Sequence, residues 1–122
     1  MPQESSRTAD DLYYAAIDHL ADGRPAAAVD SFRAALALQP SCLDARHGLI
    51  LALDAAGLID EGIAAALQLT ADQPDDVLPW TNLSILYQHA GRISDAEAAS
   101  ARAKILGWKQ ELQTNREGRA AE

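Results

Sequence analysis

The sequence predicts an all-α fold built as a short array of helical hairpins, and three observations support this prediction. The glycines Gly23, Gly57 and Gly91 lie 34 residues apart, and Pro40 and Pro74 are separated by the same interval. Alanine, the strongest helix former, accounts for 26 of the 122 residues. A regular period of this length is typical of arrays in which each hairpin stacks on the next.

The repeat boundaries follow from the prolines. Placing each proline near the end of a 34-residue unit gives three repeats, 9–42, 43–76 and 77–110. In each repeat, apolar residues recur at helical spacing in two stretches separated by a glycine. We expect the glycine to end the first helix in the left-handed conformation, and the proline, where there is one, to stop the second.

Polar residues mark the expected starts of two second helices. Asp60 and Ser94 precede apolar stretches and are predicted to be N-caps. Ser94 and Glu97 also match the capping-box pattern, in which two side chains satisfy each other's backbone donors. The sequence therefore predicts that these helices begin just after Asp60 and Ser94.

In their spacing and type, these residues resemble the tetratricopeptide repeat pattern over residues 9–110. The third repeat matches it at Trp80, Leu83, Ser84, Tyr87, Gly91, Ala96 and Ala103. The first repeat matches it at Leu12, Ala16, Gly23, Ala28, Phe32, Ala35 and Pro40. The resemblance implies an α-solenoid of three helix-turn-helix repeats, whose first helices line a concave face.

The segment after the third repeat is interpreted as a short C-terminal cap over residues 108–116. Trp108 and Leu112 are four residues apart and therefore share a helix face. The cap is expected to be a seventh helix, or an extension past a kink at Gly107. The repeat domain then covers 9–116, and the polar ends 1–8 and 117–122 are expected to be flexible.

The resemblance also places one set of residues on the concave face. Ile17, Leu51 and Ile85 recur every 34 residues and are predicted to form an apolar ladder that a partner contacts. Tyr13 adds an aromatic anchor. The alternatives are that these side chains are ordinary exposed apolar residues, or that the cap or tail covers them. The predicted partner-binding residues are Tyr13, Ile17, His47, Leu51, Asn82, Ile85 and His89.

The expected partner is a protein or peptide segment with an apolar face, flanked by basic residues. Ten basic and 18 acidic residues give a net charge of −8, which disfavours acidic ligands, nucleic acid and anionic membrane surfaces. Some tetratricopeptide domains bind the acidic C-terminal tails of chaperones through a lysine, asparagine and arginine clamp. The equivalent positions here do not match it: Tyr13, Ile17, Gly48, Leu78 and Asn82.

No motif predicts catalysis, a cofactor or a metal site. The sequence has no GxSxG, P-loop, GxGxxG or HExxH pattern. His19 is expected to be structural, and His47 and His89 lack the further ligands that a metal needs. Cys42 is the single cysteine, which excludes an intramolecular disulfide, and no neighbouring base favours its activation. We expect a protein that is not an enzyme.

Two functions remain open from the sequence. The first is a non-catalytic interaction module that binds a partner segment in its concave groove. The alternative is an accessory subunit held permanently in a larger, possibly enzymatic, complex. Self-association through the ends of the array is a third interpretation. The sequence has no apolar run of membrane-spanning length and no signal-peptide pattern, so the expected location is the cytoplasm.

Overall fold

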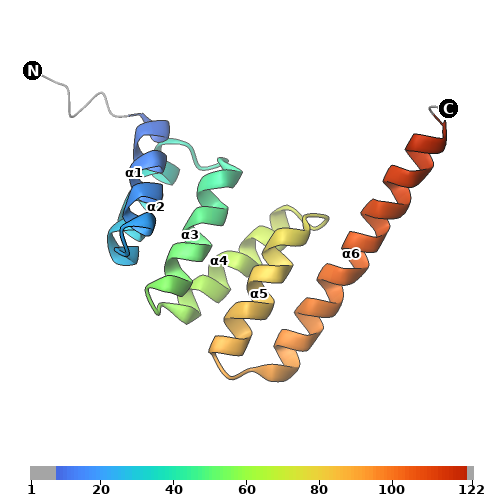
Figure 1. Cartoon of the computed structure of the whole chain (residues 1–122). Helices are drawn as coiled ribbons and strands as arrows, with labels where there is room; N and C mark the ends of the chain where they lie inside the picture. The colour runs from blue at the N-terminus through green and yellow to red at the C-terminus, as the bar shows by residue number, and fades with distance from the viewer. Residues whose placement is uncertain (1–7, 121–122) are drawn as a thin grey trace, which may run out of the picture. The chain divides into compact units, whose positions relative to one another are not determined.

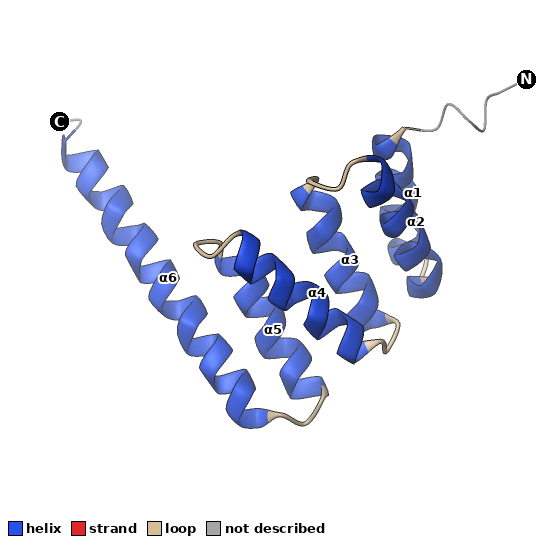
Figure 2. Cartoon of the chain, turned by 180° about the vertical axis from the view of Figure 1, so that it is seen from behind, coloured by secondary structure: helices blue, strands red, loops and turns tan. Residues whose placement is uncertain are grey.

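The computed structural model describes residues 8–120, and every regular element in this range is a helix (Figure 1). The expected flexible segment 1–8 lies outside the described residues except for Thr8. Short turns join the helices (Figure 2). The bounds are α1 (Ala9–Ala21), α2 (Pro25–Leu38), α3 (Leu43–Ala55), α4 (Ile59–Asp72), α5 (Val77–His89) and α6 (Ile93–Ala120). The prediction of an all-α fold with two helices in each repeat is confirmed.

The three glycines 34 residues apart end α1, α3 and α5 in the same way. Gly23, Gly57 and Gly91 have φ angles of 73°, 78° and 75°, the left-handed region that a residue with a Cβ seldom adopts. In the first turn, the backbone N–H of Arg24 donates to the carbonyl of His19, which closes the helix end. The period seen in the sequence is therefore a period of helix-ending turns.

The expected N-caps of α4 and α6 are wrong. The helices begin at Ile59 and Ile93, so Asp60 and Ser94 lie inside the first turn. The chain re-enters a helix directly after the left-handed glycine, because the carbonyls of Leu58 and Arg92 already accept the first helical hydrogen bonds. The residue after each glycine therefore takes the place that the sequence pattern assigned to a polar cap.

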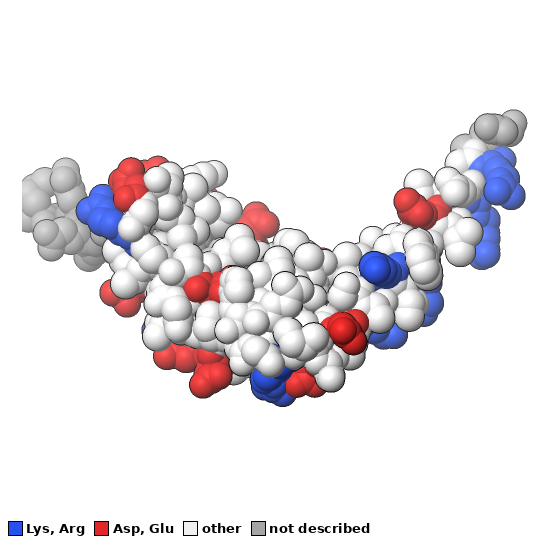
Figure 3. All heavy atoms as spheres, turned by 60° about the horizontal axis from the view of Figure 1, so that its bottom comes forward, with Lys and Arg blue, Asp and Glu red and all other residues white. Residues whose placement is uncertain are grey.

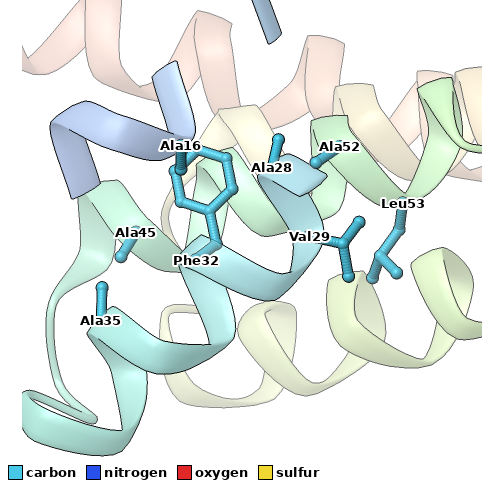
Figure 4. Packing of buried hydrophobic residues seen from close by; sticks show 8 residues of the cluster. All are labelled: Ala16, Ala28, Val29, Phe32, Ala35, Ala45, Ala52 and Leu53. Atoms are coloured by element: carbon cyan, nitrogen blue, oxygen red, sulfur yellow. The ribbon is translucent and has the colours of Figure 1, made fainter. Parts of the chain in front are cut away.

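The chain forms two compact units, Met1–Ala65 and Ala66–Glu122, and each is described by itself. The core of the first unit surrounds Phe32 of α2, whose ring is fully buried (Figure 4). Small and branched apolar residues from α1, α2 and α3 pack in the same cluster: Ala16, Ala28, Val29, Ala35, Ala45, Ala52 and Leu53. The abundant alanine lets these helices approach closely around one large ring.

Gly48 of α3 is part of this packing. A Cβ built at Gly48 would lie 2.4 Å from two ring carbons of Phe32, which is too close for any real side chain. The Phe32 ring therefore lies directly against the α3 backbone. Gly48 is required by the core and is buried, although the family pattern placed it on the concave face.

The second unit is held mainly by packing of α5 on α6. Leu83, Leu86 and Tyr87 are buried on α5, and Ala96, Ala99, Ala103 and Leu106 on α6. The buried hydroxyl of Ser84 donates to the carbonyl of Ala96 at 3.0 Å and joins the two helices. Arg92 pairs with Asp95 at the start of α6.

Helix α6 is one continuous helix of 28 residues. Of the two forms expected for residues 108–116, it shows the extension of the preceding helix and not the separate seventh helix. Its last buried residue is Leu106, and Gln110 donates to the backbone carbonyl of Asp75 at 2.7 Å, just before α5 begins. The second half of α6 therefore projects past the start of α5 (Figure 1). Residues 117–120 belong to this helix, whereas 121–122 lie outside the described residues.

Candidate protein-interaction surface

In the first unit, α1 and α3 each expose an apolar residue predicted from the 34-residue ladder. Ile17 is 39% exposed and Leu51 is 52% exposed. Asp10 lies seven residues before Ile17, and Asp44 seven residues before Leu51, so each carboxylate shares a helix face with its apolar partner. We call the surface formed by Asp10, Ile17, Asp44 and Leu51 the acidic face.

Tyr13 lies beside this face and is half-buried. Its ring contacts those of Tyr14 and Phe32 edge-on, with centroid distances of 5.4 Å and 5.9 Å. Burial raises the pKa of the Tyr13 phenol above 10.0, and the negative charge of Asp44 raises it further. Tyr13 thus packs on the core ring of Phe32 and stays neutral at ordinary pH.

The other predicted site residues fall into two groups. His47 is half-buried on α3, one turn before Leu51. In the second unit, Ile85 is 41% exposed and His89 lies exposed one turn later on α5. Each unit therefore presents an apolar residue with a histidine one helical turn away.

Asn82 does not belong to an exposed surface. It is only 6% exposed, and its side-chain amide nitrogen has no hydrogen-bond partner among the described residues. Gly48 occupies the equivalent place of the second repeat and is also buried. The same place of the first repeat holds Tyr14, which is exposed because no described helix precedes α1. In the second repeat this place lies directly against Phe32 of the first repeat.

The acidic face lies in a strongly acidic unit. Residues 8–65 contain nine acidic and three basic residues. Arg24 pairs with Asp22 at 3.1 Å, and Arg33 pairs with Glu61 at 2.5 Å. This excess of negative charge favours a partner that has positively charged residues beside its apolar side chains.

The comparison with protein families identifies the repeat. The family described as Tetratricopeptide repeat matches residues 19–83, more than half of the chain. The chain belongs to the tetratricopeptide repeat family. A search of solved structures finds similarity to the MamA protein, with a TM-score of 0.77 and 22% sequence identity. The match covers 86% of this chain and 57% of the MamA chain, and it shows the fold alone. The comparison with curated proteins gave no match.

Tetratricopeptide repeats act in general as interaction scaffolds. The surface described above offers side chains that suit non-covalent contact with a partner. Residues 8–120 bring together no group of three or more metal-ligating side chains. Cys42 is half-buried at the start of α3. Within the same range, no helix is both long and apolar enough to cross a membrane. The groups that remain available are apolar side chains, carboxylates and histidines.

Sequence reasoning missed one exposed apolar surface of this tetratricopeptide protein. Trp108 is 62% exposed and Leu112 is 65% exposed on the projecting half of α6. Their spacing was visible in the sequence, but it was interpreted as the inward face of a cap. Both side chains lie on the side of α6 that faces solvent, where a cap would have needed a core to cover.

Proposed function

We propose that this protein is an interaction module that binds a partner segment along its concave apolar residues. The binding set comprises Tyr13, Ile17, His47, Leu51, Ile85 and His89, whereas Asn82 is left out of it because it is buried. Binding needs no covalent chemistry: apolar side chains of the partner cover the exposed ladder, while carboxylates select for flanking cations. The expected partner is a helical or extended segment with an apolar face and basic neighbours.

The observation that carries this proposal is the exposure of Ile17, Leu51 and Ile85 at the same place of successive repeats. The core of each unit does not need these residues, because other positions of α1, α3 and α5 supply the buried side chains. Repeated exposure of a large apolar residue carries a cost in solubility, which a binding role explains. The family's general role as an interaction scaffold supports the same conclusion.

The test is affinity purification of the chain from its native source, with a Leu51→Asp and Ile85→Asp double variant beside the wild type. Both positions are exposed, so the variant is expected to fold, and circular dichroism checks this. We expect a partner that purifies with the wild type to be lost from the double variant. A charge at each apolar contact would have to be desolvated without a counter-ion.

A matched control uses two other exposed apolar residues, Leu38 of α2 and Ile93 of α6. The double variant Leu38→Asp and Ile93→Asp carries the same added charge away from the ladder, and it should retain the partner. Loss from both variants, or from neither, contradicts the proposed groove. If the partner bound to the wild type does not exchange when free chain is added, the result favours the alternative, a permanent subunit of a larger complex.

A further inference from the structure

Helix α6 has an apolar side that its own unit does not use. Ile105, Trp108 and Leu112 are all exposed, and their spacing of three and four residues places them on one helix face. At roughly 100° per residue, this face lies opposite the one that carries Ala99, Ala103 and Leu106 against α5. We call Ile105, Trp108 and Leu112 the α6 stripe.

Basic residues flank the α6 stripe. Residues 102–119 hold five of the ten lysines and arginines and only two of the 18 acidic residues. The net charge of this segment is therefore +3, and the rest of the chain carries −11. Figure 3 shows basic side chains gathered along the helix that leads to the C-terminus. Helical spacing places four cations beside the stripe: Lys104, Lys109, Arg116 and Arg119.

The acidic face of the first unit has the complementary pattern. There, Ile17 and Leu51 are exposed between Asp10 and Asp44 in a unit rich in carboxylates. Asp10 and Ile17 are seven residues apart on α1, and Ile105 and Leu112 are seven residues apart on α6, which is about 10 Å in each case. One surface offers apolar residues with acidic neighbours, and the other offers apolar residues with basic neighbours.

We propose that the α6 stripe of one molecule docks on the acidic face of a second copy of this chain. This inference rests on the groove function proposed above and names its partner. Pairing two α6 stripes with each other would instead bring their cations together, which opposes that arrangement. The α6 stripe and the acidic face are different surfaces of the same molecule. A docked pair therefore still has one free stripe and one free acidic face, and assembly continues beyond a dimer.

The test is sedimentation velocity of the purified full chain over a wide range of concentration, at low and high salt. The wild type is expected to grow in mass with concentration, to pass the dimer, and to dissociate partly at high salt because its ion pairs are screened. Leu112→Asp should weaken association at least about tenfold. Thr114→Asp adds the same charge two residues away on the opposite side of α6 and should behave as the wild type.

Mixing two variants tests the direction of docking. Leu112→Asp lacks a working stripe, and Leu51→Lys lacks a working acidic face, so each alone should remain monomeric. Together they are expected to form a dimer and nothing larger, because one intact stripe meets one intact face. Self-association of Leu51→Lys at the wild-type level would overturn the assignment of the acidic face.

Two further results would overturn the inference. One is a wild type that remains monomeric at every concentration, and the other is a Thr114→Asp variant that weakens as much as Leu112→Asp. Neither result bears on the proposed function, because the purification with Leu51→Asp and Ile85→Asp tests binding of any partner in the groove. A monomeric wild type whose partner is lost from that variant would leave the groove function intact.

Discussion

Gly48 is the residue at which the core of the first unit allows no side chain. A methyl group there would meet the buried Phe32 ring at 2.4 Å. Overpacking of this kind costs up to about 3 kcal/mol, and alanine regains about 1 kcal/mol of helix propensity. We expect Gly48→Ala to lower the free energy of unfolding by about 2 kcal/mol, measured by urea denaturation.

Gly107→Ala is the matched control for this substitution. Gly107 is also helical, but no atom lies within 4 Å of the position that its Cβ would take. The same chemical change should therefore stabilise the protein, by about 0.5–1 kcal/mol. Equal effects of the two variants would contradict the close packing of Phe32 on α3.

Tyr13 is expected to lower the stability of the folded protein at alkaline pH. Its phenol has a raised pKa in the folded chain because burial and Asp44 disfavour the phenolate. The neutral form therefore contributes stability that is complete below pH 10, the ordinary value for tyrosine, and is lost as the pH rises through the folded pKa. We expect Tyr13→Phe to flatten the fall in stability above pH 10, measured by denaturation across alkaline pH. Tyr14→Phe, the exposed neighbour, should keep the wild-type slope.

Single residues also show where sequence reasoning about the site stopped. The exposure of Ile17, Leu51 and Ile85 agrees with the ladder drawn from their period. The burial of Asn82 was not visible, because the family pattern gives a residue's place in the repeat but not what packs against it. The same reason explains Gly48, whose neighbour Phe32 belongs to the helix before it.

At the scale of elements, a buried hydrogen bond adds to the apolar packing of α5 on α6. The Ser84 hydroxyl donates to the Ala96 carbonyl across the helix interface. A hydrogen bond of this kind contributes about 1 kcal/mol, and alanine returns about 0.5 kcal/mol in helix propensity. We expect Ser84→Ala to lower the free energy of unfolding by about 0.5 kcal/mol, measured by urea denaturation.

Thr81→Ala is the control on the same helix. Its hydroxyl donates to the carbonyl of Val77 within α5 and is exposed. Removing it should leave the free energy of unfolding unchanged or slightly raised, because alanine is the better helix former. A loss at Thr81 as large as that at Ser84 would contradict a special role for the contact between the helices.

The end of the repeat array explains why residues 108–116 do not cover a core. Glu97, Ser100 and Lys104 of α6 occupy the places that Val29, Phe32 and Leu36 occupy in α2. In the first repeat these places carry apolar residues that pack in the core, whereas in α6 they are polar and need no cover. These polar residues were visible in the sequence, but the spacing of Trp108 and Leu112 was interpreted as the apolar face of a cap.

At the scale of the whole molecule, the end of α6 projects from the folded part. Two truncated chains measure how much each part of α6 contributes to the free energy of unfolding. No residue of 107–120 is fully buried, so a chain ending at Gln110 should keep its free energy of unfolding within about 1 kcal/mol. A chain ending at Arg102 also loses Ala103 and Leu106, and burial of Leu106 alone is worth about 2 kcal/mol. The shorter chain should therefore unfold at clearly lower urea.

The same two chains separate folding from assembly. The chain ending at Gln110 keeps the buried side of α6 but loses Leu112, Arg116 and Arg119, so it should be stable yet fail to self-associate in sedimentation velocity. If it lost stability as the shorter chain does, the projecting half would be part of the fold. If it still assembled as the wild type does, the surface that joins the copies would lie outside the second half of α6.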